Sequence, residues 1–316
     1  MNVLVLSMLS GGIGEHVARL REDSGNRFVV LSYGKTRGDF YVPVVDVPVL
    51  RAFLFLFLGF FYGLYLIKKE RISIIHSHYV FPAGLLGSLL SLASGLPQVH
   101  SVHGSDAYRL PVSLHKLIRG KIICVSRSLQ ARLASAGLSS TLIYNGINPP
   151  AGKKILLQHP AVLFVGALTS NKAGMLNAII EKAKGVDFYV AGTGPVKING
   201  AHLLGQLSRE ELSSYYASAD ILVNCSDWEG FSLAVLESFS FGLPVVARPN
   251  SALKELLGSG RGLYASTPDE FVSQINKLLN DKGLKGSITG KALVFSKEFS
   301  WKKAARELDG LYAGLV

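Results

Sequence analysis

The segment Asp227-Trp-Glu-Gly-Phe-Ser-Leu-Ala-Val-Leu-Glu237 joins a predicted strand, ILVNCS, to a helix expected from about Ser232. The first backbone N–H groups of a helix have no partner within it, and with the helix dipole they favour a bound anion. Glu229 precedes this helix start and Glu237 lies in its second turn. Two carboxylates beside a phosphate-sized site suit a ligand with vicinal hydroxyls, such as a sugar or a ribose. The spacing alone also fits a capped helix with ordinary surface acids.

Strands and helices are expected to alternate along the whole chain. The predicted strands are short, continuous apolar runs, which is typical of parallel sheets covered by helices on both faces. The clearest of these runs are VLVLS, FVVLSY, ISIIHSH, KIICVS, AVLFVG, DFYVAG, ILVNC and PVVA. Between them lie helical windows such as HVARLRED, SLQARLASAG and DEFVSQINKLLND. The pattern predicts an α/β protein.

A cluster of Asn, Gly and Pro at residues 145–152 interrupts this alternation, and a new strand is expected from Ala161. Such a cluster is typical of a linker between domains. The predicted domains are residues 1–148 and 149–298, followed by a terminal helix at 299–316. Ligands of doubly wound domains bind at the carboxyl ends of the strands.

Composition excludes several classes of protein. The chain has 316 residues, 48% of them hydrophobic, and a mean hydropathy of +0.31, which is too apolar for a disordered chain. Its two cysteines, Cys124 and Cys225, lie in apolar runs and cannot form a disulfide scaffold. They are expected to be reduced, buried thiols, which indicates a cytoplasmic protein.

Positive charge is concentrated in the first half of the chain. Residues 1–150 carry 15 basic and 7 acidic side chains, a net charge of +8 out of the total of +11. An uncharged run from Ala52 to Ile67 with seven aromatic residues lies in this half, flanked by Arg51 and by Lys68-Lys69-Glu70. It fits a buried helix or a helix in an anionic membrane interface, and it is short for a membrane span.

The histidines do not form a recognisable metal motif. His76 and His78 lie on one predicted strand, and we expect their rings on opposite faces. His100 and His103 lack a helical His-Glu-x-x-His pattern and nearby cysteines, so no metal site is predicted. No Gly-x-Ser-x-Gly elbow supports a serine hydrolase. No basic helix with interleaved aromatics supports a nucleic-acid partner.

Taken together, the segments resemble the family 4 retaining glycosyltransferases, which have the GT-B fold. The stretch EGFSLAVLESFSFGLPVVA resembles the family signature around the paired glutamates. Further similar stretches, AVLFVGALTSNKAG, IIHSHYVFPAGLLGSLLSLASGLPQVHSVHGSDAY and FSWKKAARELDGLYAGL, extend the resemblance to nearly the whole chain. It implies two Rossmann-like doubly wound domains facing across a cleft. The terminal helix would pack back on the N-terminal domain.

The resemblance also assigns roles to single residues. The residues that it places in catalysis are Glu229 near the reacting carbon, Lys172 on the diphosphate and His103 on the donor sugar. The residues that it places in substrate binding are Glu237 on the nucleotide ribose, Gly230, Phe231, Ser232, Leu233, and the glycine loops Gly11, Gly12, Gly192 and Gly194. One departure matters: Ala167 stands where the family usually has an arginine on the diphosphate.

The implied activity is transfer of a hexose from a nucleotide-diphosphate sugar, UDP- or GDP-linked, with retention of configuration and without a cofactor or metal. Absence of an Asp-x-Asp pair fits that mechanism. The implied acceptor is a hydroxyl of a glycan or of a lipid-linked molecule. If the run from Ala52 to Ile67 contacts lipid, the protein is expected at the inner face of the membrane. Two alternatives remain open: a sugar-nucleotide epimerase, and an inactive sugar-nucleotide-binding scaffold.

Overall fold

The computed structural model describes the chain except for residues 10–11, 34–37, 46 and 149–150. Its contacts divide the chain into two compact units. Unit 1 comprises Met1–Gly146 together with Ser300–Val316, and unit 2 comprises Ile147–Phe299. The division at Gly146 is close to the boundary expected after residue 148, and the terminal segment belongs to unit 1.

Over its described residues, unit 1 contains a seven-stranded parallel sheet in the order β3-β2-β1-β4-β5-β6-β7. The strands are β1 (Asn2–Ser7), β2 (Arg27–Ser32), β3 (Phe40–Tyr41), β4 (Ile74–His78), β5 (Gln98–Val102), β6 (Lys121–Cys124) and β7 (Ser140–Leu142). The central strands β1, β4 and β5 are almost fully buried, and β4 and β5 bury histidine, serine and glutamine side chains as well as apolar ones.

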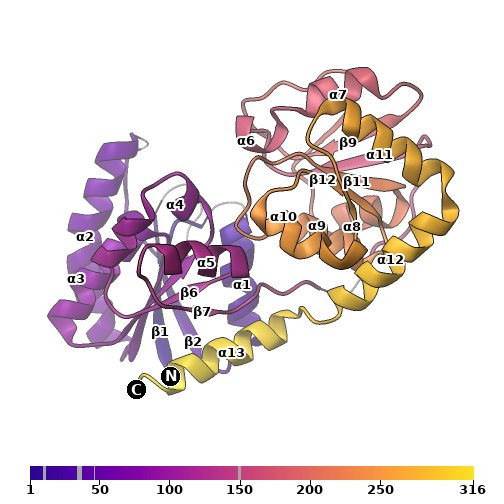
Figure 1. The fold of residues 1–316 in the computed structure, drawn as a ribbon. Coiled ribbons are helices and arrows are strands. Elements are labelled where there is room, and N and C mark those ends of the chain that lie inside the picture. Colours follow the sequence, from indigo (N-terminus) through magenta and orange to yellow (C-terminus); the bar gives the residue numbers. More distant parts are fainter. Residues whose placement is uncertain (10–11, 34–37, 46, 149–150) are drawn as a thin grey trace. The chain divides into compact units, whose positions relative to one another are not determined.

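Helices cover the sheet of unit 1 (Figure 1). They are α1 (Gly12–Asp23), α2 (Pro48–Lys69), α3 (Leu85–Ser94), α4 (Ser105–Tyr108), α5 (Arg127–Ser135) and α13 (Trp301–Ala313), with the shorter turns η1 (Val80–Gly84) and η2 (Val112–Leu117). Helices α2 and α3 lie side by side on one flank of the sheet.

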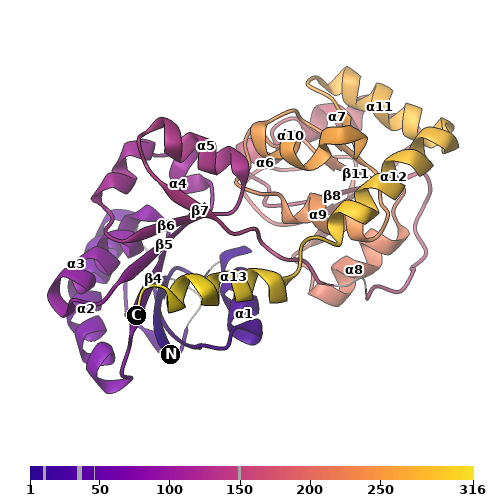
Figure 2. The same cartoon turned by 60° about the horizontal axis from the view of Figure 1, so that its bottom comes forward.

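The terminal helix α13 is an integral part of unit 1, where it packs along α1 (Figure 2). The Asp309 carboxylate accepts hydrogen bonds from Ser24 Oγ at 2.6 Å and from the Gly25 backbone N–H at 2.8 Å. Tyr312 is fully buried, and its hydroxyl lies 2.5 Å from His76 Nδ1 on β4. A segment distant in sequence thus closes the core around the first strands.

Unit 2 contains, among its described residues, a six-stranded parallel sheet in the order β10-β9-β8-β11-β12-β13. The strands are β8 (Ala161–Val165), β9 (Asp187–Ala191), β10 (His202–Gly205), β11 (Ile221–Asn224), β12 (Val245–Ala247) and β13 (Leu263–Tyr264). The prediction of two doubly wound α/β domains is confirmed, because both strand orders reverse once beside their first strand.

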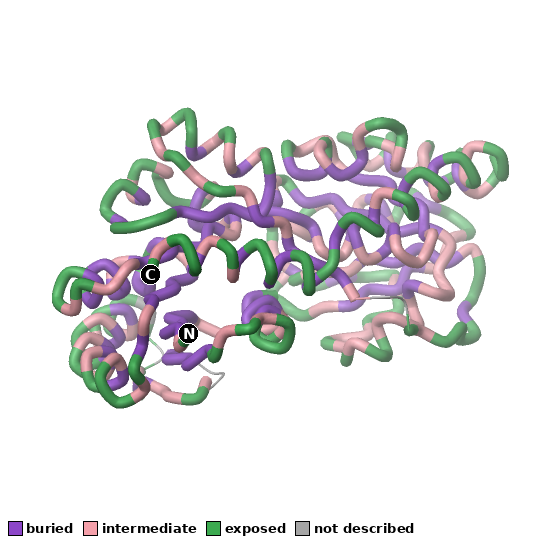
Figure 3. Tube along the Cα trace, turned by 90° about the horizontal axis from the view of Figure 1, so that it is seen from below, coloured by how far each residue is buried: buried purple, intermediate pink, exposed green. Residues whose placement is uncertain are grey.

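The helices of unit 2 pack on both faces of this sheet and complete its core. They are α6 (Ser170–Ala173), α7 (Leu176–Lys182), α8 (Arg209–Ser218), α9 (Leu233–Ser240), α10 (Ser251–Leu257), η3 (Gly258–Gly260), α11 (Pro268–Asn280) and α12 (Lys282–Ser296). In Figure 3 the buried stretches of the trace lie mainly in the interior and the exposed stretches lie mainly along outer turns. Most of the apolar residues that give the chain its high mean hydropathy therefore lie in the cores around the two sheets.

One glycine is required where α13 begins. A Cβ atom on Gly146 would lie 2.0 Å from the backbone nitrogen of Trp301, far inside van der Waals contact. The close approach of these two backbones leaves no room for a side chain. By contrast, a Cβ on Gly290 in α12 would meet nothing within 4 Å.

Replacing Gly146 by alanine is therefore expected to lower the melting temperature by several degrees, since the backbone must shift away from α13. The matched variant Gly290→Ala is expected to keep or slightly raise it, because alanine favours a helix interior over glycine by about 1 kcal/mol. Calorimetric melting of both variants measures the difference. Equal melting temperatures would contradict the close packing at Gly146.

Candidate functional site

The main candidate site of unit 2 lies where the strand order reverses, at the adjacent strands β8 and β11. Connections from these two strands leave in opposite directions along the sheet, so their carboxyl ends form a natural crevice. The turn after β8 carries Lys172 in α6, and the loop after β11 carries Glu229. Two residues 57 positions apart in sequence are brought together in this way.

Lys172 and Glu229 form a close ion pair. The Lys172 Nζ atom lies 3.2 Å from both Oε1 and Oε2 of Glu229, so the ammonium faces the carboxylate symmetrically. Glu229 is buried, whereas the Lys172 side chain is 34% exposed. Ser226 Oγ donates a further hydrogen bond of 2.9 Å to Glu229 Oε1. A buried carboxylate needs such partners, and the exposed side of Lys172 remains accessible to a ligand.

Two asparagines fix the loop that carries Glu229. The backbone carbonyl oxygen of Asn171 accepts a hydrogen bond of 2.9 Å from the backbone N–H of Asp227. The side-chain Oδ1 of Asn171 accepts one of 3.2 Å from the backbone N–H of Trp228. Asn224 Oδ1 accepts the Ser226 backbone N–H at 3.1 Å. The sequence analysis did not assign these asparagines, since a polar residue beside a strand end gives no signal until its partners are known.

Helix α9 begins directly after this loop and offers an anion site. Its N-cap residue Ser232 makes no side-chain cap; instead, Ser232 Oγ accepts a hydrogen bond of 3.0 Å from Asn224 Nδ2. Gly230, Phe231 and Ser232 are buried, and Leu233 opens the helix. Backbone N–H groups at the helix start and the Lys172 ammonium therefore supply positive charge to one region.

Glu237 has a different environment from Glu229. Its Oε2 accepts a hydrogen bond of 3.0 Å from the Tyr216 hydroxyl, which comes from α8. Burial raises the pKa of Glu237, while the Tyr216 hydrogen bond and the charge of Arg209 act against this shift. The remaining carboxylate oxygen can accept from a hydroxyl of a ligand. Tyr216 is another residue that the sequence analysis did not identify.

The glycine loop after β9 lies against the loop after β8. Gly192 has φ of +146°, and a Cβ there would lie 1.8 Å from the Gly166 carbonyl oxygen. A Cβ on Gly194 would lie 2.3 Å from the Leu168 carbonyl oxygen. These glycines are thus required by contacts within unit 2, and their predicted binding of substrate stays a prediction.

The missing arginine after Gly166 has no replacement in that loop, where Ala167 is exposed. Arg248 follows β12 and pairs with Asp227 in the loop that also carries Glu229. A second cation therefore lies beside this loop, although it is held by a carboxylate rather than directed to an anion.

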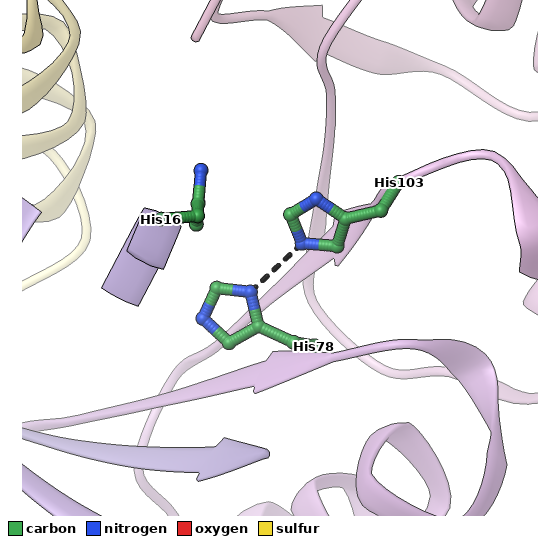
Figure 4. A group of neighbouring side chains, drawn as sticks. All are labelled: His16, His78 and His103. Atoms are coloured by element: carbon green, nitrogen blue, oxygen red, sulfur yellow. Dashed lines mark hydrogen bonds between the residues drawn. The ribbon is translucent and has the colours of Figure 1, made fainter. Parts of the chain in front are cut away.

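In unit 1 the equivalent reversal of strand order occurs between β1 and β4, and histidines gather there. His16 comes from α1, His78 ends β4 and His103 follows β5. His78 Nδ1 and His103 Nε2 are 2.9 Å apart, so one ring donates an N–H hydrogen bond to the other, while the His16 ring meets the His103 ring edge-on at 4.9 Å (Figure 4). The structure thus joins His103 to two residues that the sequence analysis did not assign.

The expectation that His76 and His78 face opposite sides of their strand is wrong. Their rings stack at a centroid distance of 4.5 Å. Residues two positions apart on a strand share one face, because side chains alternate at every residue. His76 Nδ1 lies 2.5 Å from the Tyr312 hydroxyl and His76 Nε2 lies 2.6 Å from Ser101 Oγ, so both ring nitrogens have a hydrogen-bond partner. The His76 ring packs against the His78 ring inside the core.

Burial disfavours the charged form of the clustered histidines. Burial lowers the pKa of His16 to about 4 and that of His76 to about 3. Burial also holds the pKa of His103 well below its usual range, and the neighbouring histidines add to this effect. Asp106 accepts hydrogen bonds from the backbone N–H groups of His103 and Gly104 at 3.2 and 3.1 Å, and burial raises its pKa to about 6.

Neutral imidazoles can bind sugar hydroxyls or a metal ion. The ligand nitrogens of His16, His78 and His103 lie within 4.8 Å of one another, and so do the ligand atoms of His100, Asp106 and His115. Either group could hold a transition metal after small movements. Neither ring nitrogen of His16 has a hydrogen-bond partner of normal geometry in the described part of the chain. The predicted absence of a metal site remains a prediction.

The other glycine loop is only partly described. Gly11 lies outside the described residues, and Gly12 opens α1 in an exposed position. A Cβ on Gly12 would meet nothing within 4 Å, so contacts among the described residues do not require a glycine there. Its predicted role in substrate binding rests on the resemblance.

Comparison with protein families gives two matches that together span most of the chain. Residues 10–150 match the model of "Glycosyltransferase Family 4" and residues 159–281 that of "Glycosyl transferases group 1". An uncharacterized glycosyltransferase of Methanocaldococcus jannaschii is 31% identical over 96% of this chain and 95% of its own length.

Two solved structures share the fold at low sequence identity. Sucrose-phosphate synthase of Thermosynechococcus elongatus superposes with a TM-score of 0.83 at 18% identity, covering 100% of this chain and 99% of its own. Anabaena HepE in complex with UDP-glucose superposes with a TM-score of 0.83 at 16% identity, and each chain is covered completely.

The histidine cluster predicts how stability depends on pH. The buried histidines have lower pKa values in the folded than in the unfolded chain, so below about pH 6.5 the unfolded chain binds more protons. Stability is expected to fall as the pH is lowered from 6.5 toward 4. Asp106 and Glu237 act in the opposite direction, because burial raises their pKa values in the folded chain, but two carboxyls oppose several histidines.

Thermal melting between pH 7 and pH 4.5 measures this dependence, and His16→Gln is expected to make it less steep, since one of the contributing histidines is then replaced by a side chain that does not titrate. A drop of several degrees in the wild type corresponds to about 2 kcal/mol. The control is His202→Gln, which removes an exposed histidine of unit 2. The same slope in wild type and His16→Gln would contradict the proposed origin.

Proposed function

Because this chain belongs to the group 1 glycosyl transferases, within glycosyltransferase family 4, we propose that it transfers a hexose from a nucleotide-diphosphate sugar to an acceptor hydroxyl with retention of configuration. Its fold is the GT-B fold expected from the sequence. The observation that carries the proposal is the Lys172–Glu229 pair beside the start of α9, at the point where the strand order of unit 2 reverses.

The donor would be bound by unit 2. Its diphosphate would accept hydrogen bonds from the first N–H groups of α9 and from Lys172, whose ammonium would then be shared between the phosphate and Glu229. Glu229 would accept a hydrogen bond from a hydroxyl of the sugar, and Glu237 from a ribose hydroxyl. Anabaena HepE, whose structure contains UDP-glucose, supports a UDP-linked donor, with GDP-linked donors as the alternative.

In the proposed reaction the bond between the anomeric carbon and the phosphate oxygen breaks, and the acceptor oxygen bonds to the anomeric carbon from the same face. The acceptor proton passes to the leaving phosphate oxygen. Lys172 and the positive end of α9 stabilise the negative charge that develops on the diphosphate, so no metal ion or cofactor is needed for that task. His103 stays a predicted contact of the donor sugar.

The proposed acceptor is a hydroxyl of a glycan or of a lipid-linked molecule. Support comes from unit 1, which contains most of residues 1–150 and their net charge of +8, because a positive field favours association with anionic molecules. No nucleic acid is proposed as a partner.

The roles of Lys172 and Glu229 can be tested by Lys172→Met and Glu229→Gln. Each is expected to lower kcat for the correct donor by about 100-fold or more, because each removes charge that acts on the reacting groups. The control Lys182→Met breaks an exposed ion pair with Asp269 and should leave transfer unchanged. Wild-type activity in both site variants would overturn the assignment.

The stereochemistry and the alternatives can be tested together by following the sugar anomeric signal in NMR spectra with EDTA present. With donor and acceptor, the product is expected to keep the donor configuration. With donor alone, a changed sugar would favour an epimerase, and donor binding without transfer to any acceptor would favour an inactive scaffold. An inverted product, or transfer that EDTA abolishes, would contradict the proposed mechanism.

A further inference from the structure

Helix α2 has an apolar surface on both of its sides. Its buried side comprises Ala52, Phe55, Gly59, Gly63 and Leu66. The side chains that project away from the protein are Val49, Leu50, Phe53, Phe57, Leu58, Phe61 and Tyr65, with exposed fractions from 38% to 83%. We call these seven residues the outer face of α2. A helix that is apolar all round is normally enclosed by apolar material on every side.

The outer face is continuous along the helix. Val49, Phe53, Phe57, Phe61 and Tyr65 follow one another at intervals of four residues, so each side chain lies one turn beyond the last. The Phe57 ring is 6.3 Å from the Phe53 ring and 5.4 Å from the Phe61 ring. Monomeric soluble proteins seldom expose a row of aromatic rings, and such patches mark interaction surfaces.

The buried side shows that α2 does not leave the protein. The Phe55 ring stacks on the Tyr33 ring at a centroid distance of 4.0 Å. A Cβ on Gly59 would lie 2.9 Å from Leu86, and one on Gly63 would lie 2.6 Å from Leu90, so the α2 backbone lies directly against α3. Removal of α2 would expose this core.

By length and composition alone, Val49–Lys69 is the one helix in the described part of the chain that could cross a membrane. Spanning would require all of its sides to meet lipid or other spanning helices. Because the buried side is packed into the core of the sheet domain, only the outer face can reach lipid. This geometry fits a helix lying parallel to a bilayer surface.

Charge around the outer face favours an anionic surface. Residues 47–69 include no acidic side chain, and Lys68, Lys69 and Arg71 are exposed where the helix ends. Glu70 lies among them, but its side chain is only 13% exposed and its carboxylate pairs with Arg27 at 2.9 Å. Lys69 Nζ lies 5.3 Å from the Tyr65 ring centre and 5.5 Å from that of Phe40. Tyrosine and lysine together are typical of the water–lipid boundary. Each basic residue near an anionic membrane contributes about 1 kcal/mol.

The same charge argues against a second copy of the chain as the occupant. In a symmetric dimer each outer face would meet its equivalent, and the basic residues at the helix ends would be brought toward those of the other copy.

We propose that the outer face of α2 docks the protein on an anionic lipid bilayer, with α2 parallel to the surface and its aromatic side chains among the lipid head groups and upper acyl chains. The proposal extends the proposed function, since it selects the lipid-linked class of acceptor and places transfer at the cytoplasmic face of a membrane. Docking itself requires neither donor nor acceptor.

Flotation with vesicles tests the docking. The intact protein is expected to float with vesicles of phosphatidylcholine and phosphatidylglycerol, and less with phosphatidylcholine alone. The triple variant Phe53→Ser/Phe57→Ser/Phe61→Ser should lower the partition coefficient by about tenfold or more, since three aromatic side chains lose their apolar burial. The matched control Leu156→Ser/Leu203→Ser/Val294→Ser removes exposed apolar side chains of unit 2 and should float as the wild type does.

A second measurement separates docking from spanning and from dimer formation. Phe57→Trp should gain fluorescence quenching by lipids brominated at shallow acyl positions, whereas stronger quenching by lipids brominated near the bilayer centre would indicate spanning and overturn the proposal. Sedimentation equilibrium should give a monomer for both the wild type and the triple variant. A wild-type dimer that the triple variant abolishes would assign the face to a second copy.

Failure of docking and failure of the proposed function are distinguishable. A protein that does not float at low salt, or a folded triple variant that floats fully, would overturn the docking proposal while leaving transfer to soluble acceptors intact. Circular dichroism of the triple variant verifies its folding. Flotation without any transfer would instead contradict the proposed activity and leave the docking surface standing.

Discussion

The reversal of strand order beside the first strand of each sheet is the constraint on which the sites depend. In unit 2 it separates the connections that leave β8 and β11, so Lys172 and Glu229 reach the same edge. In unit 1 the equivalent reversal between β1 and β4 brings together His16 and His78. Parallel strands end at one edge of a sheet, and a reversal leaves room there for a ligand.

The candidate site of unit 2 contains charged groups, whereas the histidines gathered in unit 1 are uncharged. In unit 2 a buried carboxylate is balanced by one ammonium and lies beside the uncapped positive end of α9, which suits an anionic ligand. In unit 1 burial keeps the histidines neutral, so they offer hydrogen bonds without charge.

Helix α2 shows how one apolar segment can serve two purposes. Its glycines allow close packing on α3, and its outer aromatics remain exposed. The sequence showed an uncharged apolar run, which fitted either a buried helix or a helix in a membrane interface. Only the packing of Gly59 against Leu86 decided which side is occupied by the protein.

The sequence by itself determined the α/β class, the two doubly wound sheets and the segment from Asp227 to Glu237, because these follow from local periodicity and from motifs of adjacent residues. It did not reveal Asn171, Tyr216, His16 or His78 as parts of the sites, and it placed the His76 and His78 rings wrongly. Those contacts join residues on different elements. Their partners were decided by strand order and packing, since hydrogen bonds, burial and the resulting pKa shifts depend on distances that only the tertiary structure sets.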